Sequence, residues 1–270
     1  MPVTMLPARS EVDESFTWDL SSLFATDKDY LVELAAVPAA IEDLGGFRGR
    51  LGTSATLLGD FFEQLWDTSV RLRKLANYSS LPVTVDQTDQ AARARAGRFQ
   101  ALAAQYDAAT AYVAPELLEL GQARLTELIG ADPRLTHLHR YIELLEKRRP
   151  HVRSGEVESV LSAANDPLSA GERAYNSLTN GEIPFTTVMH AGAEHEVARS
   201  TYPKLRMAAD RELRRKAYES YADGFLAFDD TITELYVGRV KQSVFTARAR
   251  GYANTVEEQL APREVPRSVL

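Results

Sequence analysis

Apolar residues recur with the period of an α-helix along most of the chain. Between residues 54 and 80, Phe61, Leu65, Leu72 and Leu75 follow one another at steps of four, seven and three, which places them on one side of a helix. A second helix of about 25 residues is indicated further on, because apolar residues repeat there at every fourth position. These residues are Ile232, Tyr236, Val240 and Val244. The pattern therefore predicts a mainly α fold, a lobe of many helices.

Capping residues, glycines and prolines divide this pattern into segments. Gly45-Gly46 is typical of the left-handed end of a helix, and Leu81-Pro82 is expected to end the next one. Asp132-Pro133 suits a helix start, and the spacing from Ser169 to Glu172 is that of a capping box. The predicted helices are 27–44, 54–80, 86–112, 115–130, 133–149, 154–164 and 169–180. The helical pattern returns at residue 202, is interrupted at Gly251 and ends with a short helix at 254–260.

The pattern changes between residues 181 and 201. Ile183–Met189 and Glu194–Ser200 are short runs with strand-like composition, and Ala191-Gly192 lies between them. This arrangement predicts one small β-hairpin near residues 183–200. We therefore divide the chain into four regions: an N-terminal tail at 1–15, a helical region at 16–180, the hairpin at 181–201 and long helices at 202–270.

Composition and charge exclude several classes of protein. The 270 residues include no cysteine, which removes zinc ribbons, iron–sulfur clusters, thiol catalysis and disulfides together. The net charge of −7 argues against a nucleic-acid partner. The most apolar stretch, Leu34–Ile41, contains Pro38 and is far shorter than the ~20 residues that span a bilayer. Because the first residues also lack the pattern of a signal peptide, we expect a cytoplasmic protein.

Histidines are the candidate metal ligands, and their spacing argues against a metal site. His137 and His139 are two residues apart in a predicted helix, so their side chains diverge by about 200°. His195-Glu196 begins like the His-Glu-x-x-His motif of zinc peptidases, but Arg199 stands where the second histidine would be. That stretch is also predicted to be a strand. We therefore assign no metal ligand among the five histidines, which are His137, His139, His151, His190 and His195.

No other motif identifies a reaction. The sequence lacks a Gly-x-Ser-x-Gly elbow, a phosphate-binding Gly-x-x-x-x-Gly-Lys loop and a Gly-x-Gly-x-x-Gly turn. The pairs Asp229-Asp230 and Glu257-Glu258 are adjacent in sequence, so the side chains of each pair point about 100° apart on a helix and do not form a dyad that shares a proton. We assign no catalytic and no cofactor-binding residue. A metal-free enzyme with a Ser or Asp site formed only in space is a minor alternative.

Two further groups of residues have a structural interpretation. Tyr218, Tyr221, Phe225 and Phe228 recur at steps of three and four, which favours a role in the core over ligand stacking. The basic cluster 147–153 comes at the end of a predicted helix, where positive charge is favourable against the negative end of the helix dipole. We prefer this interpretation to a binding patch.

Seven short motifs follow one another along the chain, and together they carry a family resemblance. They are Trp18–Phe24, Leu178–Phe185, Tyr202-Pro203, Asp210–Tyr218, Ala247–Asn254, Glu257–Leu260 and Val265-Pro266. Their order and spacing resemble the N-terminal half of the oligoendopeptidase F family, relatives of thimet oligopeptidase among the zinc metallopeptidases. The resemblance extends over about residues 15–270.

The resemblance implies a mostly helical protein in which two lobes enclose a deep channel for short peptides. In such enzymes zinc is held by a His-Glu-x-x-His helix and a later glutamate, and the glutamate of the motif acts as general base. Those residues lie in the family's C-terminal half, so the resemblance implies no catalytic residue and no zinc ligand in this sequence. Zinc is expected only for a full-length family member.

The expected function follows from the lack of the family's zinc-binding and catalytic residues in this sequence. The chain is expected to be the substrate-channel lobe of a truncated or split peptidase, and to be inactive alone. Its expected partners are an oligopeptide substrate, a complementary C-terminal catalytic fragment and a second copy of itself, with no nucleic acid and no membrane. The alternative is a stand-alone helical module, derived from the same family, that binds another protein.

Overall fold

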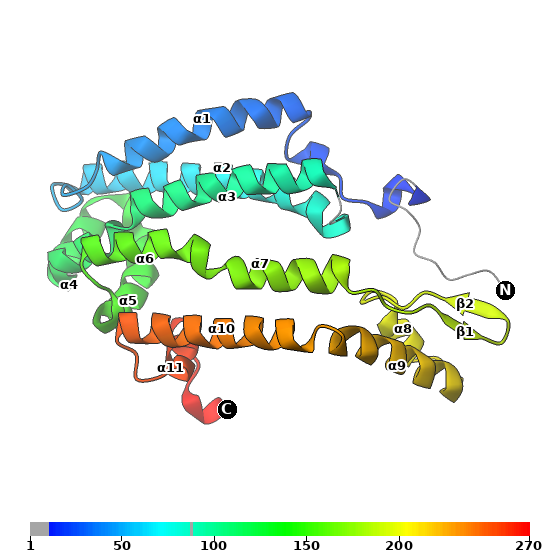
Figure 1. Ribbon diagram of the computed structural model, residues 1–270. Helices are drawn as coiled ribbons and strands as arrows, with labels where there is room; N and C mark the ends of the chain where they lie inside the picture. The colour runs from blue at the N-terminus through cyan, green and yellow to red at the C-terminus, as the bar shows by residue number, and fades with distance from the viewer. Residues whose placement is uncertain (1–10, 87–88) are drawn as a thin grey trace.

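A computed structural model describes residues 11–86 and 89–270, and the described part is mainly helical (Figure 1). Most of the predicted N-terminal tail, up to residue 10, lies outside the described residues. Three long helices pack side by side in the upper layer of Figure 1. They are α1 (Asp27–Gly45), α2 (Ala55–Val85) and α3 (Gln90–Thr110). The prediction of a multi-helix lobe is confirmed.

The remaining helices form one end and the lower layers of the molecule. Two of them close the left-hand end in Figure 1, α4 (Val113–Ala131) and α5 (His139–Arg148). Below the first layer lie α6 (Gly155–Leu168) and α7 (Ala170–Ser177), and α7 packs on α10 (Asp229–Arg250). The other helices are α8 (Tyr202–Arg206), α9 (Arg211–Leu226) and α11 (Thr255–Leu260). The α9 and α10 helices follow one another along the lower edge.

The predicted β-hairpin is present at the right-hand end of Figure 1 and is shorter than its sequence pattern. The strands β1 (Val188–His190) and β2 (Ala193–His195) pair antiparallel, with Met189 opposite Glu194. Ala191 and Gly192 form the turn, with φ of 50° and 74°. Two positive φ angles give the turn a twist that matches the right-handed twist of the strands, so this dipeptide sets the register of the hairpin.

Buried side chains form three separate clusters. The largest surrounds Phe61 of α2 and lies between α2, α4 and α5. A second cluster fills the space between α1, α2 and α3, where the rings of Tyr30 and Tyr78 stack at 4.9 Å. Because α2 contributes to both, these two clusters share one long helix. The third cluster lies between the hairpin, α8 and α9, and consists of Val188, Val197, Leu205, Leu213 and Ala217.

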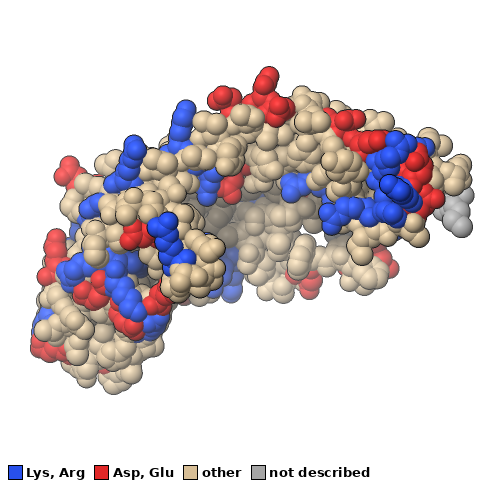
Figure 2. Space-filling model, turned by 90° about the horizontal axis from the view of Figure 1, so that it is seen from below, with Lys and Arg blue, Asp and Glu red and all other residues tan. Residues whose placement is uncertain are grey.

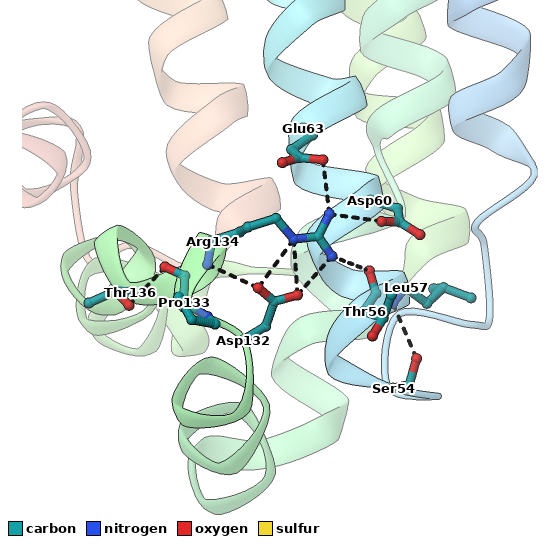
Figure 3. Close-up of polar contacts among 9 residues, drawn as sticks. All are labelled: Ser54, Thr56, Leu57, Asp60, Glu63, Asp132, Pro133, Arg134 and Thr136. Atoms are coloured by element: carbon teal, nitrogen blue, oxygen red, sulfur yellow. Dashed lines mark hydrogen bonds and ion pairs between the residues drawn. The ribbon is translucent and has the colours of Figure 1, made fainter.

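Arg134 ties the turn that follows α4 to the first turns of α2 (Figure 3). Its guanidinium donates to Asp132 Oδ2 at 2.7 Å, and to Asp60 Oδ1 and Glu63 Oε2 at 2.9 Å each. The hydrogen bonds that Asp132 accepts from the Arg134 side chain and from its backbone N–H hold the pKa of the Asp132 carboxyl below its usual value. Gly59 makes this approach possible, because a Cβ atom there would lie 2.5 Å from Arg134 Nη2.

Several helix ends differ from the predictions. The α2 helix continues past Pro82 to Val85, since Asp86 N–H still donates to the Pro82 carbonyl at 3.0 Å. Gly46 ends α1 with a φ of −65°, so the expected left-handed cap is wrong at that position. The predicted helix 115–130 is interrupted at Gly121, where φ is 76°. Residues Pro133–Leu138 form a 3-10 helix before α5.

The expected capping box at Ser169 is also wrong. Ser169 has a helical backbone and its hydroxyl donates to the Asn165 carbonyl at 2.5 Å, so it does not cap α7. The preceding helix, α6, runs on to Leu168 and leaves no extended residue for a cap. Ser154, in contrast, caps α6 as predicted, and Gly251 ends α10 in the left-handed conformation with a φ of 72°.

Candidate functional surface

The α10 helix presents apolar side chains to solvent along most of its length. Tyr236 is 69% exposed, Phe245 is 46% exposed and Val240 is 44% exposed, whereas Ala247 is buried. The predicted four-residue repeat from Ile232 to Val244 therefore lies largely on the surface. Apolar side chains gathered on one exposed helix are typical of a surface that another protein or segment covers.

A groove between α7 and α10 interrupts this surface. It has a volume of about 440 Å³ and is lined mainly by apolar and aromatic side chains, with Glu172 and Arg239 at its polar side. The Arg239 guanidinium lies 3.9 Å from the Glu172 carboxylate. The apolar lining is Tyr175, Ile232, Leu235 and Tyr236. Apolar walls with a few charged groups are the usual lining of a pocket for a small molecule or a side chain.

The end of α10 near Gly251 is fixed to α6 by an ion pair. Arg250 Nη1 and Nη2 donate to the two oxygens of Glu158 at 2.9 and 3.0 Å, and the Arg153 backbone N–H donates to Glu158 Oε1 at 2.9 Å. The ring of His151 stacks on Tyr252 at 3.6 Å, and burial raises the pKa of the Tyr252 hydroxyl. These contacts set the position of α10 relative to the large core.

At the other end, aromatic rings join the hairpin region to α9. The Tyr221 ring lies between Phe185, at 5.1 Å, and Tyr202, at 4.0 Å, and is nearly parallel to both. Phe225 packs beside them, so the core interpretation holds for Tyr221 and Phe225. It is wrong for Tyr218, which is 61% exposed.

The five histidines have different local environments. His137 packs on Trp66, and His139 is exposed at the start of α5. His190 Nε2 lies 3.4 Å from Asp210 Oδ1, and His195 is in β2. Among residues 11–86 and 89–270, no group of three His, Cys, Asp or Glu side chains could hold a metal ion.

The structure gives positions or partners for the acidic pairs and the basic cluster. Asp229 and Asp230 lie in the first turn of α10, while Glu257 accepts the backbone N–H of Ala253 at 2.9 Å and Glu258 accepts from the Gln259 side chain. In the cluster 147–153, Lys147 pairs with Glu143 and Glu264, and Arg149 pairs with Glu146. Arg140 also pairs with Glu264, which joins α5 to the segment after α11.

Comparison with known proteins identifies the fold first. The structure matches the crystal structure of oligoendopeptidase-F from Enterococcus faecium with a TM-score of 0.84 and 22% identity, over 90% of this chain and 48% of that one. At that identity the match shows that the fold is shared. What the two proteins share is therefore the mainly helical fold described above, which accounts for about half of the Enterococcus faecium chain.

Sequence comparisons then identify the relatives. The chain is 28% identical to group B oligopeptidase PepB of Streptococcus agalactiae, over 97% of this chain and 44% of the relative. It is 28% identical to oligopeptidase PepF of Bacillus subtilis, over 98% of this chain and 40% of the relative. A family model described as Oligopeptidase F matches residues 116–185. The resemblance seen in the sequence is confirmed: the chain is related to the N-terminal half of oligoendopeptidase F peptidases.

Two further findings bear on function: the share of the relatives that the chain covers, and the search for membrane-spanning helices. The chain spans less than half the length of the curated relatives described above. Within the described residues, no helix is both long enough and apolar enough to cross a membrane. The exposure of the α10 repeat is not visible in the sequence, because helical periodicity alone does not distinguish a core face from a face exposed to solvent.

Proposed function

We propose that the chain is the substrate-channel lobe of a cytoplasmic peptidase of the oligoendopeptidase F type, which acts on short peptides. The observation that supports this most is the set of exposed apolar side chains along α10, in a chain related over nearly all its length to one half of such peptidases. In this proposal, residues 16–180 form the outer helical region, residues 181–201 the hairpin, and residues 202–270 lead towards a catalytic domain that holds zinc.

The proposal divides the chemistry between two parts of a peptidase. In this proposal the lobe positions and confines the peptide, and the zinc ligands belong to the other part. The groove beside Tyr236 suits an apolar side chain of the bound peptide, and Arg239 lies at its edge to contact a peptide carbonyl or carboxylate. The alternative, a stand-alone module that binds another protein, uses the same apolar surface.

The first expected result is that the chain alone does not cleave peptides. Purified protein is mixed with zinc and an oligopeptide that carries a fluorophore and a quencher, and the fluorescence is followed. We expect no cleavage above the rate of a sample without protein, because the lobe does not hold the metal that activates water. Turnover that needs zinc and stops with a chelator would contradict the proposal.

The second expected result concerns association through α10. Burial of exposed apolar surface favours self-association, so sedimentation velocity should show dimers that disappear in a double variant Val240→Glu and Phe245→Glu. The matched control is Val157→Glu with Val160→Glu, which places the same charges on exposed positions of α6 and should sediment like the parent. A strictly monomeric parent chain would count against an exposed interface on α10.

A further inference from the structure

Positive charge is concentrated at the end of the molecule that carries α8 and α9. Between residues 199 and 216 there are seven Lys and Arg residues and two carboxylates, in a chain whose net charge is −7. Figure 2 shows blue side chains gathered at its right-hand end, where Figure 1 places the hairpin and α9. The hairpin itself adds Glu194 and Glu196, so the positive charge belongs to α8, α9 and their flanks.

Three of these cations are held in place by neutral oxygen atoms. Arg199, Arg214 and Lys216 each donate a hydrogen bond to a hydroxyl, an amide or a backbone carbonyl. Arg199 donates to Thr179 Oγ1 at 3.0 Å and to Asn180 Oδ1 at 2.9 Å. Arg214 donates to the carbonyls of Ala208 and Ala209 at 2.6 and 2.8 Å. Lys216 donates to the Met189 carbonyl at 3.0 Å. Such bonds fix the direction of the side chain, and they do not offset its charge.

Three more cations are exposed and unpaired. Within the part of the chain that the structure describes, Lys204, Arg206 and Arg211 form no ion pair and no side-chain hydrogen bond. Arg215 differs, because its guanidinium is paired with Glu212 and Glu219 on the same helix face. We define the basic end as the six other cations, namely Arg199, Lys204, Arg206, Arg211, Arg214 and Lys216.

The size of the basic end limits what it can bind. The cations of α9 lie within its first six residues, which span only about 9 Å of helix, and α8 packs directly against α9. Arg211 and Arg214 are three residues apart and share one side of α9, whereas Lys216 points towards the hairpin, where it contacts Met189. A long polyanion would meet the negative charge of the rest of the molecule, whereas a short segment with two or three carboxylates would contact only the basic end. Guanidinium groups also match the paired oxygens of a carboxylate.

We propose that the basic end binds short acidic peptide segments, and so gives the lobe a preference for oligopeptides rich in Asp and Glu. This inference rests on the proposed function as a peptide-binding lobe and adds the class of peptide to it. The fixed cations orient the bound segment and the unpaired ones neutralise its carboxylates. Screening by salt should weaken the interaction, because all six groups lie at the surface.

The test measures binding of two fluorescent octapeptides to the 270-residue chain by anisotropy. One peptide carries three glutamates and the other carries glutamines at the same positions. We expect the glutamate peptide to bind about tenfold more tightly at low ionic strength, and the difference to shrink as salt is added. The triple variant Lys204→Ala, Arg206→Ala, Arg211→Ala should remove most of that difference.

A matched triple variant controls for net charge. Lys28→Ala, Arg73→Ala and Lys74→Ala remove three exposed cations from α1 and α2, and should leave the preference unchanged. Circular dichroism establishes that both variants keep the helical fold.

Equal affinity for the two peptides would overturn the inference while the proposed lobe function stands. Tighter binding of an eight-nucleotide DNA strand than of the glutamate peptide would overturn it as well. Zinc-dependent cleavage by the chain alone would instead overturn the lobe function and leave the charge preference measurable.

Discussion

The variant Phe61→Ala should lose about 3–5 kcal/mol of unfolding free energy. Phe61 is fully buried in the largest cluster, and its ring contacts those of Phe47 at 5.4 Å and Phe62 at 5.2 Å. Removing the ring gives up its transfer free energy and leaves a cavity that α2, α4 and α5 cannot close, since each is fixed by its own contacts. Urea denaturation followed by circular dichroism measures the change in the midpoint.

The control for this prediction is Phe245→Ala on α10. Phe245 is 46% exposed, so its truncation should change the unfolding free energy by no more than about 0.5 kcal/mol. The comparison separates a phenylalanine that stabilises the fold from one that lies on the proposed docking surface. Equal destabilisation by the two substitutions would show that α10 packs into the core.

The variant Glu158→Gln should destabilise the protein by about 2 kcal/mol. The Glu158 side chain is only 12% exposed and holds both the Arg250 guanidinium and the Arg153 backbone N–H. The amide keeps the shape but removes the charge and one acceptor, so the Arg250 guanidinium loses its counter-ion. The unfolding free energy is measured as for Phe61→Ala.

The matched control is Glu219→Gln, which breaks an exposed pair with Arg215 on α9. Exposed pairs of this kind contribute little, so its effect should stay below about 0.5 kcal/mol. If Glu158→Gln were as mild as this control, the ion pair would not be what fixes the end of α10 to α6.

Local patterns predicted the elements of the fold better than their ends. The apolar repeat around Phe61 and the Ala191-Gly192 turn each indicated the correct element, because the period of the side chains and the φ of two residues are properties of a short segment. The signals at Pro82 and Ser169 gave wrong predictions. The α2 helix continues through Pro82 to Val85, and Ser169 follows directly on α6 with a helical backbone, so it is not in the extended conformation that a cap of α7 needs.

The candidate surfaces required the three-dimensional structure. The repeat from Ile232 to Val244 has the same spacing as a core helix, so the sequence could not show that it faces solvent. The basic end could be noticed as a local excess of Lys and Arg. Only the contacts distinguish Arg215, which is paired with carboxylates, from Arg214, which is held by carbonyls.

The third buried cluster is the smallest of the three and can unfold locally. The two large clusters are joined by α2 and should melt together, whereas the five residues around Val188 and Leu213 are separate from them. A small unit of this kind can open on its own while the scaffold stays folded. Amide protons of the hairpin and of the start of α9 should then exchange sooner than those of α2, which hydrogen exchange measures directly.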